Sequence, residues 1–251
     1  MGKREKILNL ILPIFSILTI VFFWSVAAIA VGDGLILPSV KETFAALFDL
    51  LLSEKFYSAL LSTLLRSLIA FSVSFALAFF TAFLSYKYKY AKKFLAPVIT
   101  IIRTLPTIAV VLLLVVWTNS KVAPVIVTTL VVFPTMHSEL SVAFGGIDED
   151  ALVMCKVFSV GKKDRFNKVV LPQIAPYLIS SVGSGLTLNL KLMVAAEVLA
   201  STARSIGYLL NTSKIYFETA TMTALVIFTL LIGLIVEGVF SFLSKKAGKF
   251  L

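Results

Sequence analysis

One face of an apolar stretch near residue 190 carries side chains that could form a polar path. Ser180, Ser184, Thr187 and Lys191 follow one another at steps of four, three and four residues, which places them on one side of a helix. A polar stripe with a central cation can line a water-accessible pathway through an apolar medium. The alternative is a structural ion pair between Lys191 and a neighbouring helix. Glu197 is a candidate for that partner, or for an outer gate.

The chain lacks the residue patterns of catalytic or metal chemistry. No phosphate-binding loop of the form G-x-x-x-x-G-K-S/T occurs, and no nucleophile and base have a recognisable spacing. One cysteine, Cys155, and one histidine, His137, cannot supply an intrachain disulfide or a Cys/His zinc site. We therefore expect no catalytic residue, no metal and no cofactor, and any ATP hydrolysis must occur on a separate subunit.

These residues belong to a chain of 251 residues whose apolar residues form long blocks. Hydrophobic residues make up 59% of the chain and charged residues 14%, and the mean hydropathy is +1.01. A bilayer core of about 30 Å needs roughly 20 helical residues per crossing. The sequence therefore predicts an all-α, polytopic membrane protein with one transmembrane domain over residues 1–251. Six segments meet the length: 7–31, 59–85, 94–117, 122–144, 174–199 and 219–243.

Lysine and arginine residues are divided unequally between the two sides of the predicted membrane. The N-terminus, the 86–93 and 145–173 connections and the C-terminus hold three, four, five and three of them, whereas the alternate connections hold five in all. Because cytoplasmic segments retain Lys and Arg, this predicts a multi-pass protein of the cell membrane with both termini cytoplasmic. The net charge of +10 lies in short connections, which argues against a nucleic-acid partner.

Other charged side chains also fall inside the predicted spans. Arg66, Glu139 and Glu237 lie near the ends of their spans, so snorkelling or interfacial pairing is expected for these three. The lone His137 is interpreted as a helix-packing residue rather than as part of a proton relay.

The segment after the first span carries the signals of a separate helix. Ser39 and Glu42 have the spacing of a capping box, in which side chains and backbone N–H groups of the first turn bond reciprocally. Apolar residues then recur at helical intervals: Val40, Phe44, Leu47, Phe48 and Leu51. The pattern predicts an amphipathic helix along the outer membrane interface. The alternative is an extension of the second membrane helix.

The 145–173 connection is the longest on the predicted cytoplasmic side and contains its own helix signals. Acidic residues at 148–150 favour a helix start, and Gly161 followed by two lysines predicts its end. Between these limits one face is apolar: Ala151, Met154, Cys155 and Phe158. This stripe fits either the groove of a partner or the chain's own membrane helices. Pro172 is expected to break the chain before the fifth span.

Four stretches have the character of a known family: ILPSVKETFAAL, IIRTLPTIAVVLLLVVW, GKKDRFNKVVLPQIAPYLISS and VAAEVLASTARSIGYLLN. From about residue 37 to residue 246 the chain resembles the permease subunit of a type I ABC importer, the binding-protein-dependent inner membrane component, in its nitrate, sulfonate and taurine branch. The resemblance implies the type I ABC importer permease fold, a homodimer with the pathway between its copies, a cytoplasmic ABC ATPase and an external substrate-binding protein. Small residues of the fifth span would pack either between copies or within one: Ser180, Ser181, Gly183, Ser184 and Gly185.

In that family the long cytoplasmic loop carries a Glu-Ala-Ala motif, a glycine six residues after its Glu and a Leu-Pro pair, and it docks on the ATPase as a coupling helix. Alignment on Leu171 and Pro172 places Val-Met-Cys at 153–155 on Glu-Ala-Ala, and Ser159 on the glycine. The acidic residue of the motif is absent here. The resemblance implies coupling roles for Ala151, Met154, Cys155, Phe158, Ser159, Gly161, Leu171 and Pro172.

Together these observations predict the membrane-spanning subunit of an ATP-driven importer. Its solute would be a small anion similar to nitrate, sulfonate or taurine, or a pyrimidine similar to a thiamine precursor. An ion-coupled secondary transporter is the alternative, although no inverted repeat is evident in the six spans. A membrane scaffold without transport activity is a third. The candidate pathway residues are Ser180, Ser184, Thr187, Lys191 and Glu197.

Overall fold

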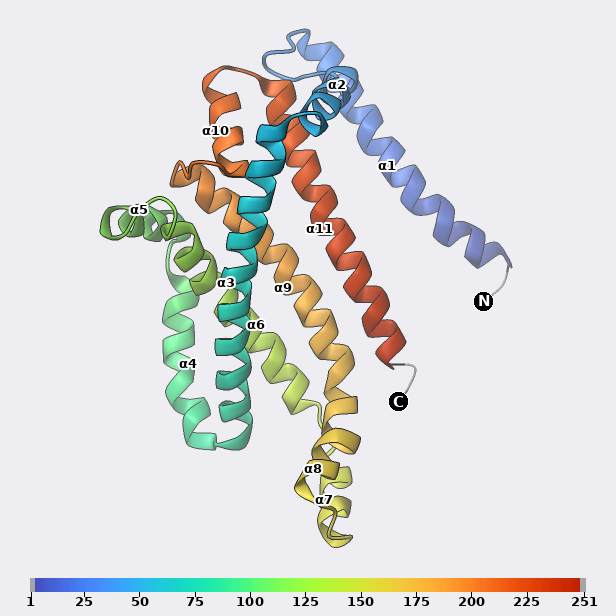
Figure 1. The fold of residues 1–251 in the computed structure, drawn as a ribbon. Coiled ribbons are helices and arrows are strands. Elements are labelled where there is room, and N and C mark those ends of the chain that lie inside the picture. Colours follow the sequence, from blue (N-terminus) through green and yellow to red (C-terminus); the bar gives the residue numbers. More distant parts are fainter. Residues whose placement is uncertain (1–2, 249–251) are drawn as a thin grey trace.

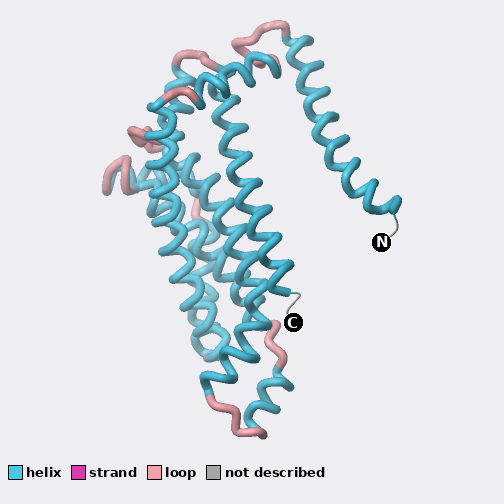
Figure 2. The backbone as a smooth tube through the Cα atoms, turned by 45° about the vertical axis from the view of Figure 1, so that its right-hand side comes forward, coloured by secondary structure: helices cyan, strands magenta, loops and turns pink. Residues whose placement is uncertain are grey.

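The computed structural model describes residues 3–248, and every regular element in that range is a helix (Figures 1 and 2). The long helices are α1 (Lys3–Val31), α3 (Glu54–Lys87), α6 (Ala123–Gly145), α9 (Leu171–Leu199) and α11 (Thr219–Gly248). The shorter ones are α2 (Val40–Leu51), α4 (Lys89–Thr104), α5 (Thr107–Trp117), α7 (Glu149–Val157), α8 (Lys162–Arg165), a π-helical turn (Phe166–Val170) and α10 (Ile206–Ile215). The all-α, polytopic prediction is confirmed.

Within residues 3–248, five helices are long and apolar enough to cross a membrane, and a bent pair brings the number to six if it forms one crossing. The predicted spans 7–31, 59–85, 174–199 and 219–243 each fall within one of the long helices, and 122–144 falls within α6 except for its first residue, Val122. Large apolar side chains lie exposed along their outer faces, for example Leu68, Phe80 and Leu231. In water such exposure would be unfavourable, but in a bilayer these side chains meet lipid.

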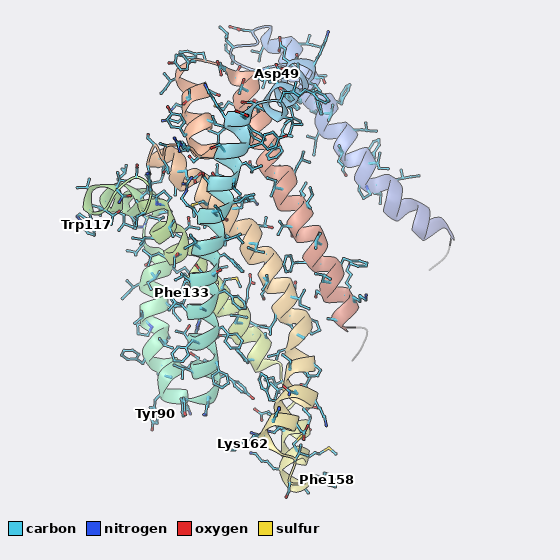
Figure 3. The ribbon with its side chains drawn as sticks, viewed as in Figure 1. Asp49, Tyr90, Trp117, Phe133, Phe158 and Lys162 are labelled. Atoms are coloured by element: carbon cyan, nitrogen blue, oxygen red, sulfur yellow. The ribbon has the colours of Figure 1, made fainter. Side chains whose placement is uncertain are left out.

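The expected span at 94–117 is wrong as a single helix. The chain forms α4 and α5 instead, and their axes meet at 89°. Pro106 lies between them and has no N–H to continue the ladder, while Leu105 before it takes an extended conformation with ψ of 130°. Trp117 at the end of α5 projects away from the bundle (Figure 3).

α3, α6, α9 and α11 form the central bundle. One buried cluster joins α3, α6 and the start of α9: Phe71, Val132, Met136, Leu140 and Ile174 are among its members. A second cluster lies nearer α2 and α10 and includes Phe56, Leu190, Ile206 and Leu225. Because lipid tails are as apolar as these side chains, the clusters hold the helices together through close packing rather than through transfer out of water.

Two glycines of α9 are used for packing within this chain. A Cβ at Gly183 would overlap the side chain of Phe240 on α11, and a Cβ at Gly185 would overlap the Met136 sulfur on α6. Glycine at these positions therefore allows close approach of helices inside one copy. Ser180 and Ser184 are exposed instead, so they remain available to a second copy or to solute.

The predicted amphipathic helix is confirmed as α2, and it is separated from α3 by Leu52 and Ser53. The capping box is complete: the Ser39 hydroxyl accepts from the Glu42 N–H, and the Glu42 carboxylate accepts from the Ser39 N–H at 2.8 Å. The backbone and hydroxyl bonds from Ser39 lower the pKa of Glu42 below its usual value. The cap therefore stabilises α2 above the ordinary glutamate pKa and weakens as the pH falls through the lowered value.

α1 stands apart from the bundle, and its contacts are mainly with α2 and the intervening loop (Figure 1). The Trp24 indole N–H donates to the Pro38 carbonyl at 3.1 Å, which anchors the end of α1 to that loop. Between Ile11 and Val31 the apolar side chains are almost all exposed.

Candidate functional site

At the end of the bundle that carries α2 and α10, a buried ion pair joins three segments. The Arg66 guanidinium on α3 lies 2.7 Å from the Glu197 carboxylate on α9, and the Glu197 side chain is fully buried. The same carboxylate accepts from the Thr63 hydroxyl at 2.9 Å and from the Gly207 N–H at 3.4 Å. Arg66 therefore does not snorkel alone, and Glu197 is not the ion-pair partner of Lys191.

This Glu197 cluster holds the loop between α9 and α10 in place. Arg66 donates to the Arg204 carbonyl, and the Thr63 hydroxyl accepts from the Ile206 N–H. Gly207 packs so closely on Glu197 that a Cβ there would overlap its backbone and side chain. Thr63 and Gly207 were not predicted as site residues. The only sequence signal for Thr63 is its position one helical turn before Arg66, an arginine inside a predicted span.

Three of the five candidate pathway residues share one exposed face of α9. Ser180, Ser184 and Lys191 are exposed. Thr187 is mostly buried, and its hydroxyl donates to the Gly183 and Gly233 carbonyls at 3.1 and 3.3 Å. The structure therefore brings Ser180, Ser184 and Lys191 together and separates Glu197 from them.

Two carboxylates flank this face. On the α6 side, the Ser184 hydroxyl donates to the Glu139 carboxylate at 3.1 Å. On the α11 side, Lys191 and Glu237 line one groove of about 490 Å³ between α9 and α11. The two ion pairs among the described side chains are Arg66–Glu197 and Lys168–Asp164, so Lys191 pairs with no described carboxylate. An exposed, unpaired ammonium group inside a membrane span is costly unless water, solute or another subunit covers it.

His137 and Arg103 connect the helices on the other side of α6. The two His137 ring nitrogens lie 2.9 Å from the Thr81 hydroxyl and 3.3 Å from the Ser141 hydroxyl, so this buried ring is a packing residue as predicted. Arg103 donates to the Pro134 carbonyl at 3.2 Å and to the Ser138 hydroxyl, which ties α4 to α6. Asn189 on α9, which was not predicted, donates to the Ser67 carbonyl at 2.8 Å.

The helix predicted in the 145–173 connection is α7, and Asp148 caps its start. Its end differs from the prediction. The helix stops at Val157, and Ser159 takes the left-handed conformation with φ of 52°, whereas Gly161 has φ of −58°. The Val160 N–H donates to the Cys155 carbonyl at 2.9 Å and the Ser159 N–H to the Lys156 carbonyl, which is the Schellman pattern. Ser159, not Gly161, ends α7.

α7 has two apolar faces. Cys155 is buried and Leu152 packs against the core cluster, so this side rests on the chain's own helices. Val153, Met154, Val157 and Phe158 are exposed by 54%, 59%, 74% and 72%, and we call them the α7 outer face. Figure 3 places Phe158 at the end of the molecule farthest from Asp49. Ala151 is half-buried, so the predicted stripe divides between the two faces.

The expectation that Pro172 breaks the chain is wrong. The helical run continues from Lys162 to Leu199 through the π-helical turn Phe166–Val170, and Pro172 lies in the first turn of α9. Pro172 has no N–H to donate to the preceding turn, and the wider π turn before it accommodates the proline ring without ending the helix. Leu171 is exposed and Pro172 half-buried. α8 and the membrane helix α9 therefore form one continuous element.

A comparison with family models matches residues 74–249 to the binding-protein-dependent transport system inner membrane component. The chain belongs to this family. The match includes the α7 outer face and the exposed face of α9. This permease is therefore the membrane-spanning transport subunit of an ABC importer, and the family does not favour an ion-coupled secondary transporter.

Solved transporters share the fold of this permease. A structure described as an inward facing conformation of the MetNI methionine ABC transporter is 12% identical, with a TM-score of 0.66 over 78% of the permease and 99% of that chain. A structure of an amino acid ABC transporter with histidines is 18% identical, with a TM-score of 0.57 over 78% of the permease and 94% of that chain. At these identities the similarity supports the fold alone. The comparison with curated proteins found no match.

Proposed function

We propose that the permease passes a small anion, similar to nitrate, a sulfonate or taurine, from an external binding protein to the cytoplasm. The unpaired Lys191 on the exposed face of α9 supports this choice, because a cation in the path attracts an anion more strongly at low dielectric than in water. A pyrimidine similar to a thiamine precursor is the second candidate, since Ser180 and Ser184 offer hydrogen bonds to a neutral ring.

The proposed assembly is a homodimer whose pathway lies between two copies, with the exposed face of α9 turned toward the partner copy. Both termini and α7 lie on the cytoplasmic side in this arrangement, and α2 and α10 lie outside. Cations at the α7 end support it: Lys156, Lys162, Lys163, Arg165 and Lys168. The external binding protein would then meet the end that the Glu197 cluster holds in place.

The α7 outer face carries the proposal that a cytoplasmic ABC ATPase drives this permease. Four large apolar side chains are exposed on one turn and a half of helix at one end of the molecule, and the proposed arrangement puts them outside the membrane, where lipid tails cannot cover them. An apolar helix face of this size is typical of a helix that fills a protein groove. Because α8 continues into α9, movement of a docked ATPase would be passed directly to the proposed pathway helix.

Replacement of Phe158 by alanine tests this docking. A large central side chain in such a contact contributes about 2 kcal/mol or more, so we expect roughly a thirtyfold loss of ATPase affinity and ATP hydrolysis uncoupled from uptake. Phe48→Ala is the matched control, because Phe48 is similarly exposed but lies on α2 at the other end. Parental ATPase affinity and uptake in the Phe158→Ala permease would show that α7 does not dock the ATPase.

A further inference from the structure

A second cavity lies between α3, α4 and α6, away from the proposed pathway. It has a volume of about 690 Å³ and is lined by cations and hydroxyl groups, among them Lys87, Lys89, Lys92, Ser85 and Ser141. No carboxylate occurs among the described residues that line it. None of these lysines forms one of the two ion pairs found in the described part of the chain. The cavity, which we call the α3–α4 pocket, therefore carries uncompensated positive charge.

The start of α4 adds to this charge. Its N-cap residue, Tyr88, makes no side-chain bond to the first turn, and that turn holds no acidic residue. Free N–H groups and the helix dipole make a helix start positive, so a carboxylate or a bound anion is favourable there and lysines are not. Lys89 and Lys92 nevertheless occupy this turn and line the pocket. Such an arrangement is stable when an anion lies between the lysines and the helix start.

The wall of the pocket contains a polar group with no partner. Ser85 is 8% exposed, and its hydroxyl has no hydrogen-bond partner in the described structure. A buried hydroxyl without a partner is unfavourable, so an occupant that accepts a hydrogen bond from it would stabilise the site. This observation is independent of the helix start and of the lysine count.

Tyrosines indicate the depth at which the pocket lies. Tyr86, Tyr88 and Tyr90 are 42%, 50% and 86% exposed around the turn between α3 and α4, and Figure 3 places Tyr90 at that turn. Exposed tyrosines gather where lipid headgroups meet water. Retention of lysines on one side of a membrane explains their presence but does not require them to converge on one cavity with a buried hydroxyl.

We propose that the α3–α4 pocket binds a phosphate group, and that the source is the headgroup of an anionic phospholipid in the adjoining leaflet. Basic pockets between membrane helices are suited to such headgroups. The proposal requires only that the chain spans a bilayer, so it does not depend on the transported solute or on ATPase docking.

Native mass spectrometry of the full-length permease in detergent tests the site, with phosphatidylglycerol, phosphatidylcholine and inorganic phosphate titrated separately. We expect tighter binding of phosphatidylglycerol than of phosphatidylcholine. Each lysine should contribute about fivefold, so Lys89→Gln with Lys92→Gln should weaken phosphatidylglycerol binding on the order of twentyfold. Lys93→Gln with Lys246→Gln is the control of equal charge, because neither residue lines the pocket, and it should retain parental affinity.

Ser85→Ala provides a second variant that leaves the charge unchanged. It should lower phosphatidylglycerol affinity about fivefold without lowering the melting temperature of the lipid-free permease. Binding of inorganic phosphate as tight as that of phosphatidylglycerol would overturn the lipid source and assign a soluble phosphate compound. Equal binding of the two lipids, equal loss in the control pair, or unchanged affinity in Ser85→Ala would overturn the site.

Discussion

The ion pair between Arg66 and Glu197 is the most deeply buried charge arrangement among the described side chains. Both charges had to leave water, and the cost is offset by the Thr63 and Gly207 bonds as well as by the pair itself. Three segments of the chain, α3, α9 and α10, meet at this one carboxylate. Glu197, which the sequence indicated as a gate or as a partner of Lys191, therefore holds these segments together.

Removal of one partner of this pair should destabilise the permease strongly. Glu197→Ala leaves Arg66 without its carboxylate in a site with little water, so we expect a loss of about 3 kcal/mol or more. Thermal unfolding in detergent measures it. Asp164→Asn breaks the exposed Lys168–Asp164 pair and should cost at most about 0.5 kcal/mol. Similar losses in the two variants would contradict the central role of Glu197.

Replacement of Lys191, unlike that of Glu197, should have little effect on stability. Its ammonium group makes no ion pair among the described residues, so Lys191→Met should leave the melting temperature close to that of the parent. If the residue lies in the pathway, anion uptake into vesicles should fall at least tenfold. Lys121→Met, just before the start of α6, serves as a control that removes one lysine elsewhere. A variant that transports at the parental rate would exclude Lys191 from the pathway.

Among the helices, α7 ends in a Schellman turn that determines how the α7 outer face is presented. Ser159 adopts a left-handed conformation, which costs a residue with a Cβ about 1 kcal/mol or more. Glycine is the residue most common at such a helix end. The permease therefore accepts strain at the end of α7. The Cys155 and Leu152 contacts hold α7 against the bundle in spite of that strain.

Replacement of Ser159 by glycine should relieve this strain. We expect α7 to become more stable by about 1 kcal/mol, seen as slower hydrogen exchange of its amide groups. Gly161→Ala is the matched control two residues later, because Gly161 has an ordinary φ and a Cβ there would contact nothing within 4 Å. Faster exchange in Ser159→Gly would show that the serine side chain itself stabilises the turn.

At the scale of the whole molecule, the two ends of the bundle differ in kind. α2, α10 and the Glu197 cluster form one end, and α7, α8 and the α3–α4 turn form the other (Figure 1). The first is tied together by buried polar contacts, whereas the second presents exposed apolar and cationic surfaces. This asymmetry agrees with the proposed arrangement, in which the α2 and α10 end faces outward and the α7 end contacts an ATPase.

The proposed orientation can be measured on intact cells. In a Cys155→Ala background, a membrane-impermeant maleimide should label the permease with Asp49→Cys and should leave the permease with Lys162→Cys unlabelled until the membrane is opened. Both residues are exposed, and Figure 3 shows them at opposite ends. The reverse labelling pattern would invert the proposed topology and place α7 outside the cell.

Local patterns were sufficient for much of this permease. Apolar blocks of about twenty residues predicted the five long helices, because a bilayer imposes that length on each crossing. The Ser39 and Glu42 spacing predicted the start of α2, because a capping box is made within one helical turn. The acidic start of α7 was predictable for the same reason. These features depend on residues within a few positions of one another.

Contacts between distant residues were decided only by the tertiary structure. Glu197 pairs with Arg66 rather than with Lys191 because α3 and α9 pack with those turns side by side, although 131 residues separate the two. Cys155 faces inward and Met154 outward because core packing fixed the rotation of α7. The bend at Pro106 and the continuous helix through Pro172 were likewise not predictable from local sequence. Whether a proline ends, bends or begins a helix depends on which neighbours satisfy the backbone groups it leaves free.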